Sequence, residues 1–252
     1  MSDLQYTPPR PPEPPAPPPP PPPPTEPPAP QAPGTQFDFG KPFTFVFEDP
    51  RWLEKILIGG LFYLAGFLII GWFFLLGYNA KLARNVVAGV AHPLPDWDDL
   101  GGYFSEGLRL VGVVLVYIIP FIVLAVGVMV PAAILDSMDN DVISAMASFI
   151  AAGFSCLMVP LSLLMIIFMP ASLTFAVMEQ RFNAAFEFGR LWPYIRNNAG
   201  NYALAVVVYL VARFLGGFGV FLLCIGVIFT GFWSTLVTTH AFSQVYRLSS
   251  KR

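Results

Sequence analysis

Four long runs of this chain carry no charged side chain, and they limit what it can fold into more than any other feature. They cover residues 56–80, 110–135, 142–178 and 197–212. A helix needs about 20 apolar residues to cross a bilayer core about 30 Å thick. Charged residues make up only 12% of the chain, whereas soluble domains carry about 25%. The sequence therefore predicts an all-α, polytopic membrane bundle whose first partner is the lipid bilayer.

The first 42 residues differ from the rest by their proline content. They hold 19 of the 27 prolines, eight of them in a row at 17–24. Proline fixes φ and removes a backbone donor, so this segment cannot build helix or sheet, and it has almost nothing apolar to bury. We expect a disordered proline-rich tail at 1–42 and a membrane domain at 43–252. The tail is either a stiff spacer or a docking peptide for a protein that binds proline-rich sequences.

The number of spans depends on the run 56–78. Its length fits one crossing, which gives five spans and places the tail outside the cell. The distribution of basic residues favours six, because lysine and arginine concentrate in cytoplasmic loops. A hairpin bend near Gly71 would bring the N-terminal flank to the cytoplasmic side with the other basic segments. These are the connectors 79–109 and 179–201 and the C-terminus, with three basic residues each, whereas the turn 136–141 has none. We favour six spans in the cell membrane, short interfacial helices between them, and a cytoplasmic tail.

The stretch "AHPLPDWDDLGGYFSEGLRL" (91–110) concentrates polarity between two apolar runs. Calcium or magnesium could take carboxylates at such spacing, but the ordered D-x-[DN]-x-[DN]-G loop is absent and no second acidic cluster of like density completes a cage. We therefore expect no metal site at its candidate ligands, which are His92, Asp96, Asp98, Asp99 and Glu106.

A structural interpretation accounts for the same residues. Pro93 and Pro95 end the preceding helix, and Trp97 sits at the level of the lipid headgroups. Asp98 or Asp99 caps a short interfacial helix over 100–109. On this interpretation the substitution Asp96→Asn is nearly silent.

Arg213 is the one charged residue between 202 and 246, and charges inside membranes are functional candidates. If "GGFG" at 216–219 is a turn, Arg213 lies near the outer interface, close to the acids of the turn 136–141. If the helix continues to Cys224, it lies near the midplane and needs a buried partner. We favour the interfacial position. His240 is expected to be an interfacial polar residue rather than a proton relay.

A string of residues resembles a prokaryotic domain-of-unknown-function family. Its members are multi-pass membrane proteins with a G-Y…R…G…L-P-x-W-D-D signature. The resemblance covers roughly 43–250, and the L-P-x-W-D-D segment is its specific part. It implies location and architecture but supplies no catalytic residues. The matching residues are Asp49-Pro50-x-Trp52-x-x-Lys55, Gly77-Tyr78, Arg84, Gly89, Leu94-Pro95-x-Trp97-Asp98-Asp99, Gly107-Leu108 and Tyr117-x-x-Pro120.

Motifs of known chemistry are absent from the sequence: it has no H-E-x-x-H, no P-loop, no G-x-S-x-G and no zinc spacing of Cys and His. We therefore expect no enzymatic activity and no cofactor, and the net charge of -2 favours no nucleic-acid partner. The leading hypothesis is a scaffold or accessory component of a membrane assembly. The alternative is a small-solute transporter, which would need a polar cavity near mid-bilayer; a membrane enzyme is third.

Overall fold

The computed structural model describes residues 36–138, 140–221 and 225–250, and every regular element in these ranges is a helix. The expected all-α class is confirmed for this part of the chain, whereas residues 1–35 of the proline-rich tail lie outside it. The elements are α1 (Lys41–Thr44), η1 (Phe45–Glu48), α2 (Trp52–Ala65), η2 (Gly66–Leu68), α3 (Ile70–Ala88), α4 (Leu100–Asp136), α5 (Asp141–Glu179), η3 (Asn183–Phe186), α6 (Phe188–Asn197), α7 (Ala199–Gly217), η4 (Phe218–Phe221) and α8 (Gly226–Ser249).

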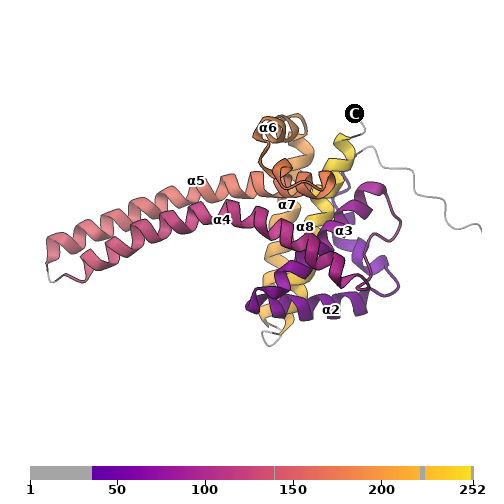
Figure 1. Cartoon of the computed structure of the whole chain (residues 1–252), viewed down its shortest axis with the longest axis horizontal. Coiled ribbons are helices and arrows are strands. Elements are labelled where there is room, and N and C mark those ends of the chain that lie inside the picture. Colours follow the sequence, from indigo (N-terminus) through magenta and orange to yellow (C-terminus); the bar gives the residue numbers. More distant parts are fainter. Residues whose placement is uncertain (1–35, 139, 222–224, 251–252) are drawn as a thin grey trace, which may run out of the picture.

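Helices α4 and α5 pair as a long antiparallel projection, which we call the arm (Figure 1). Asn140 begins α5 as its cap, since its Oδ1 accepts from the backbone N–H of Val142 at 3.0 Å. In the most apolar 18 residues of each helix, only 6% of α4 and 0% of α5 is buried. Apolar surface of this extent is foreign to a water-soluble monomer.

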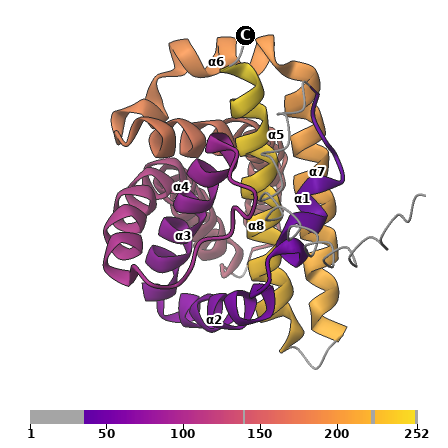
Figure 2. The same ribbon diagram turned by 90° about the vertical axis from the view of Figure 1, so that its right-hand side faces the viewer.

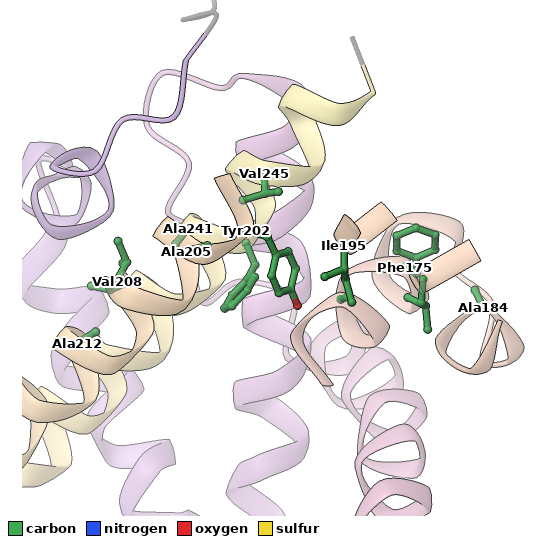
Figure 3. Packing of buried hydrophobic residues seen from close by; sticks show 13 residues of the cluster. Phe175, Ala184, Ile195, Tyr202, Ala205, Val208, Ala212, Ala241 and Val245 are labelled. Atoms are coloured by element: carbon green, nitrogen blue, oxygen red, sulfur yellow. The ribbon is translucent and has the colours of Figure 1, made fainter. Parts of the chain in front are cut away.

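The other helices and the roots of the arm form a compact body. Figure 2 looks along the arm, with α7 and α8 upright, so the arm leaves the body across their direction. The largest buried cluster joins α5, α6, α7 and α8 (Figure 3). In it, the ring of Tyr202 packs on Phe242 with centroids 5.2 Å apart, and its hydroxyl donates to the carbonyl of Ile167. The root of α5 is thereby fastened to α7 and α8.

The contact between α3 and α4 depends on two glycines. A Cβ added at Gly77 would lie 1.9 Å from the carbonyl oxygen of Tyr103, and one at Gly107 would lie 1.6 Å from that of Phe73. The two backbones therefore touch directly, because any larger residue would force the helices apart. This crossing fixes where the arm leaves the body.

The run 56–78 is not one helix. It bends at η2 and at Ile69, whose φ of 67° lies in the left-handed region, and this bend separates α2, of 14 residues, from α3, of 19. A hairpin is present as the basic residues suggested, with its bend just before Gly71. A Cβ at Gly71 would lie 2.1 Å from the carbonyl oxygen of Phe62, so glycine is needed where the two arms of the hairpin meet.

The prediction of six spans is wrong for the described residues. Three helices are long and apolar enough to cross a membrane: α4, α5, and α7 continued through η4. Helix α2 is short, Lys81 and Arg84 interrupt the second half of α3, and Thr238, Thr239 and His240 interrupt α8. The count of lysine and arginine at the ends of spans took no account of polar residues within the hairpin and the last helix, and it therefore gave too many spans.

The interfacial helix expected at 100–109 is also wrong as a separate element. These residues form the first turns of α4, which runs unbroken from Leu100 to Asp136. A short amphipathic helix does occur in the second connector, where α6 buries Leu191 and Ile195 against the body.

Contacts with the body begin before the expected boundary at residue 42. Phe37 packs against the largest cluster, and the ring of Phe43 lies 6.2 Å from that of Trp233. In the orientation that satisfies both atoms of its side-chain amide, Gln244 of α8 donates to the carbonyl of Asp38 at 3.1 Å and accepts from the N–H of Asp38 at 3.0 Å. The segment 36–42 therefore packs on the folded body, where Phe37 supplies an apolar contact and Asp38 a backbone contact.

Candidate functional site

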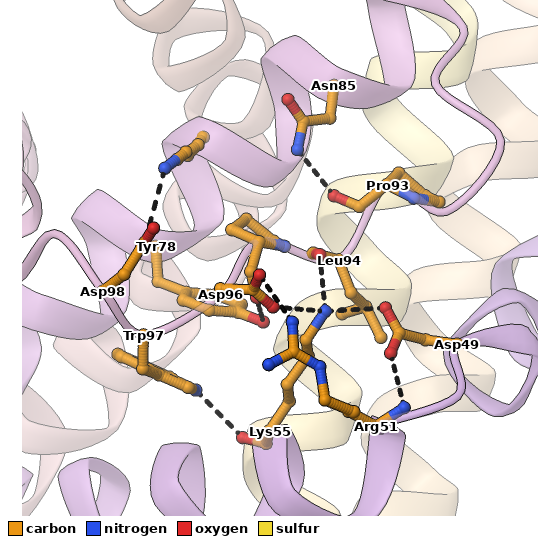
Figure 4. Close-up of polar contacts among 12 residues, drawn as sticks. Asp49, Arg51, Lys55, Tyr78, Asn85, Pro93, Leu94, Asp96, Trp97 and Asp98 are labelled. Atoms are coloured by element: carbon orange, nitrogen blue, oxygen red, sulfur yellow. Dashed lines mark hydrogen bonds and ion pairs between the residues drawn. The ribbon is translucent and has the colours of Figure 1, made fainter.

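The polar stretch between α3 and α4 is held in place through its backbone carbonyls, to which side chains from other parts of the chain donate. Each carbonyl from Pro93 to Asp96 accepts a hydrogen bond from a side chain. Figure 4 shows those at Pro93 and Leu94. Buried carbonyls need a partner, and two prolines remove the N–H groups that a regular element would use. The segment is therefore extended and pinned at every step. The donors are Asn85 to Pro93 at 2.8 Å, Lys55 to Leu94 at 2.9 Å, Tyr78 to Pro95 at 2.8 Å, and Tyr103 to Asp96.

Lys55 is the centre of a buried ionic cluster under this segment. Its Nζ lies 2.7 Å from Oδ2 of Asp49 and 2.9 Å from Oδ1 of Asp96. The Lys55 and Asp49 side chains are only 8% and 5% exposed. Asp49 also accepts from the backbone N–H of Arg51 at 2.8 Å, just before α2 begins. The cluster therefore ties the start of α2 to the segment before α4.

Asp96 is an ion-pair partner and not a free carboxylate. Besides Lys55, it accepts from Nη2 of Arg51 at 2.6 Å. The hydrogen bond from Lys55, followed by that from Arg51, lowers the pKa of Asp96 below its ordinary value. The expectation that Asp96→Asn is nearly silent therefore does not fit this geometry, because the substitution would remove the charge that both cations face.

Trp97 packs inside an aromatic cluster and does not project outward. Its ring stacks on Tyr78 with centroids 4.1 Å apart and on Phe62 at 4.9 Å, and its Nε1 donates to the carbonyl of Lys55 at 3.1 Å. Each aromatic pair of this kind adds about 0.5–1.5 kcal/mol beyond its buried area. Trp97 thus joins α2, α3 and the pinned segment, where the sequence suggested a headgroup anchor.

The remaining acids of the stretch have separate roles. Asp99 caps α4, accepting from the N–H of Gly102 at 2.9 Å, whereas Asp98 is exposed and lies 3.9 Å from Lys81. The cap expected at one of these two positions is therefore Asp99. No group of three or more His, Cys, Asp or Glu in the described ranges lies close enough to hold a metal ion.

Arg84 and Glu106 lock the base of the arm. Nη1 of Arg84 on α3 donates to Oε1 of Glu106 on α4 at 2.9 Å, and Arg109 pairs with the same carboxylate. The guanidinium of Arg109 also contacts the end of α5, where it donates to the carbonyl of the C-cap residue Gln180 at 2.7 Å. Three helices are thus joined by one chain of charge-assisted hydrogen bonds.

Arg213 lies apart from these residues, one turn before α7 ends at Gly217. The residues 216–219 are not the turn that was expected, because Gly216 and Gly217 end α7 and the next two residues continue it in η4. The α4–α5 turn and its acids are at the far tip of the arm, away from α7 (Figure 1). The guanidinium of Arg213 is exposed and lies 5.6 Å from the ring centroid of Tyr209. His240 is buried and stacks on Phe45 at 4.4 Å, so it is not the interfacial residue that was expected.

Of the five residues singled out from the sequence, Trp97, Asp98, Asp99 and Arg84 surround the pinned segment or the arm base, and Arg213 does not. The sequence alone did not single out the donors that hold the segment, which are Asn85, Lys55, Tyr78 and Tyr103. Two of them, Lys55 and Tyr78, belong to the string that carried the family resemblance. Treating that whole string as one site would have found them.

One family model matches the chain, over residues 60–225, and its description is "Protein of unknown function (DUF4013)". The match covers more than half of the 252 residues, so the chain belongs to this family. It includes the L-P-x-W-D-D segment and ends just before α8. The expected resemblance to a domain-of-unknown-function family is confirmed at that level. No curated protein and no solved structure matches the chain.

Proposed function

We propose that this member of the DUF4013 family is a multi-pass integral membrane protein without enzymatic activity, which serves as a scaffold or accessory component of a membrane assembly. The observation that carries the proposal is the bare, apolar arm held at a rigid base by the pinned segment and the Arg84–Glu106–Arg109 chain. A rigid base and an apolar arm are what a membrane anchor requires. The polar groups of the L-P-x-W-D-D segment are used in internal contacts, which favours a structural role for it.

The arm has the dimensions of a membrane hairpin. The core side chains of the α4 root end at Val113, and of the residues beyond it on α4 only Ala132 is buried. Residues 114–136 would extend about 34 Å at 1.5 Å per residue, close to the bilayer core of about 30 Å. We therefore assign the two proposed crossings to the outer parts of α4 and α5.

The basic residues give the arm a direction. Lysine and arginine concentrate on the cytoplasmic side, which places the connectors 79–109 and 179–201 inside and the acidic α4–α5 turn outside. The contact of Asp38 with Gln244 keeps the start of the folded body beside the end of α8. We propose that the proline-rich tail, which precedes Asp38, also lies in the cytoplasm.

Helix α7 is the third helix of sufficient length and apolarity, but it runs across the arm (Figures 1 and 2). Helices that cross one bilayer tilt by about 0–40° from its normal. Helix α7 could join the arm in the bilayer only if the arm turned at its root, where Pro120 of α4 and Pro170 of α5 each remove one backbone hydrogen bond. The proposal therefore rests on the two crossings of the arm.

The scaffold function can be tested on the native protein. Solubilised in mild detergent, the full chain should elute together with a second protein in a fixed ratio. Replacing residues 17–24 by a Gly/Ser segment of equal length separates the two roles of the tail, because loss of the partner indicates docking and retention indicates a spacer. Elution of the full chain as single copies without a partner protein would contradict the scaffold function.

A small-solute transporter is the second candidate, favoured by a cavity of about 720 Å³ lined by α3, α4, α5, α7 and α8. Its wall includes hydroxyl and amide groups, among them Asn79, Thr235 and Thr239, but most of its lining residues are aliphatic or aromatic. A polar solute would therefore face mainly apolar surface. Solute uptake by liposomes that contain the purified protein, absent from protein-free liposomes, would favour transport over the scaffold function.

A further inference from the structure

The cavity between the arm and α7 is large enough for a ligand, and its wall is mostly apolar with a few polar groups. At about 720 Å³, it lies within the range of small-molecule sites, about 300–1,000 Å³. Leucine, isoleucine, valine and methionine side chains from α3, α4 and α5 cover much of it, including Leu115 and Ile118 of α4 and Met165 and Ile166 of α5. An occupant must therefore present hydrocarbon to most of this surface.

Several uncharged polar groups of the wall already have hydrogen-bond partners within the protein. Asn79 donates to the carbonyl of Leu75 at 2.8 Å and accepts from Oγ1 of Thr239 at 2.8 Å. Thr235 and Thr238 donate to carbonyls of their own helix, those of Phe232 and Ser234, at 2.7 and 2.8 Å. Because these groups already have hydrogen-bond partners, they do not need a polar solute to satisfy them.

Among the residues that the structure describes, Arg213 is the one charged residue that lines the cavity. Within the described residues its guanidinium lies over the Tyr209 ring and has no carboxylate partner. A guanidinium on apolar surface is costly unless it faces an anion, and its fork of donors matches carboxylate and phosphate oxygens. Arg213 therefore defines the chemistry of one part of an occupant, and the aliphatic wall defines the rest.

The position of Arg213 fits a lipid headgroup. It lies one turn before the end of α7, and Trp72, another lining residue, lies two residues after the start of α3. The α2–α3 bend, η4 after α7 and the start of α8 are at the same end of the body in Figures 1 and 2. Tryptophan and arginine are side chains that meet lipid headgroups at a membrane interface, and most of the other lining residues offer apolar surface to a hydrocarbon chain.

We propose that the cavity binds one anionic phospholipid, with its headgroup at Arg213 and a hydrocarbon chain between the arm root and α3. This site is independent of the scaffold function, because it needs no partner protein. A lipid in this position would fill the space between the arm and the body and stabilise their contact.

Native mass spectrometry of the purified full chain tests the site. The probes are dioleoyl phosphatidylglycerol and dioleoyl phosphatidylcholine, which share their chains and differ in headgroup charge. One phosphatidylglycerol should bind about tenfold more tightly than phosphatidylcholine, the loss expected when a charge-assisted hydrogen bond is removed. Arg213→Gln should abolish this preference, and Arg213→Lys should keep part of it. Arg196→Gln is the matched control, since Arg196 is exposed on α6 and does not line the cavity.

Two further measurements identify the source of the anion and the location of the hydrocarbon chain of the lipid. Inorganic phosphate at millimolar concentration should not displace the lipid, because it cannot use the apolar wall. Val114→Trp, which fills the cavity from α4, should prevent binding of both lipids while thermal unfolding still shows a folded protein. Equal affinity for the two lipids, an unchanged preference in Arg213→Gln, displacement by phosphate, or lipid binding unaltered by Val114→Trp would each overturn the proposal.

Discussion

Removing the amine of Lys55 should destabilise the protein far more than removing a surface amine. In Lys55→Met, the Asp49 carboxylate, only 5% exposed, would keep its charge and lose its partner at 2.7 Å. The carbonyl of Leu94 would lose its donor as well. Breaking a buried ion pair by removing one partner costs about 3–5 kcal/mol, a large share of a total stability of about 5–15 kcal/mol.

Two variants make the test specific. Lys81→Met removes a partly exposed amine, which lies 3.9 Å from Asp98 and 5.3 Å from the ring centroid of Tyr103, and should cost no more than about 1 kcal/mol. The double variant Asp49→Asn with Lys55→Met leaves no buried charge unpaired, so it should be more stable than Lys55→Met alone. If Lys55→Met is too unstable to purify, recovery of folded protein in the double variant still tests the argument.

Equilibrium unfolding in detergent, followed by tryptophan fluorescence, is the appropriate assay. Trp97, one of the five tryptophans, stacks on Tyr78 beside the cluster, so part of the emission comes from the segment that Lys55 holds. The reasoning is refuted if Lys55→Met and Lys81→Met lose the same free energy of unfolding, or if the double variant is less stable than Lys55→Met.

Three further predictions use the same assay. Gly107→Ala should cost about 1–3 kcal/mol because its Cβ meets backbone, whereas Gly101→Ala, with nothing within 4 Å, should be neutral or stabilising; equal effects would contradict the backbone contact. Asp99→Ala should cost about 0.5–2 kcal/mol as a lost cap, with Asp98→Ala within about 0.5 kcal/mol of wild type; the reverse order would place the cap at Asp98. The lowered pKa of Asp96 means that its stabilising charge is present above the ordinary aspartate pKa and lost as pH falls through the lower, folded value. Wild type should therefore lose stability on acidification more steeply than Asp96→Asn, and parallel pH profiles would count against the ion pair.

Much of the helical layout could be read from the sequence, because it depends on local signals. The bend near Gly71 and the acidic turn before α5 both occur close to where composition suggested. The number of spans could not be read in the same way. Lys81 and Arg84 follow an apolar run closely enough that a count of basic residues treats them as a loop, whereas in the structure they continue α3.

Only the local part of the site could be predicted, because the other contacts join residues that are far apart in the sequence. The cap at Asp99 is local and was anticipated. The ionic cluster joins Lys55 to a segment about 40 residues later, and no periodicity connects residues so far apart. Asp96→Asn was therefore expected to be nearly silent, although two cations, Arg51 and Lys55, contact Asp96 from either side of the start of α2.

The central claim is that the arm crosses the membrane from a rigid cytoplasmic base, and cysteine accessibility tests it most directly. With Cys156 and Cys224 replaced, single cysteines are placed at Ser105 near the base, Asn197 in the second connector, and Ser137 at the arm tip. In intact cells an impermeant maleimide should label only the cysteine at Ser137, and the other two should react after permeabilisation. If all three positions react alike in intact cells, the arm does not cross and the account fails; if only Ser105 and Asn197 react, the arm crosses in the opposite direction to the one proposed.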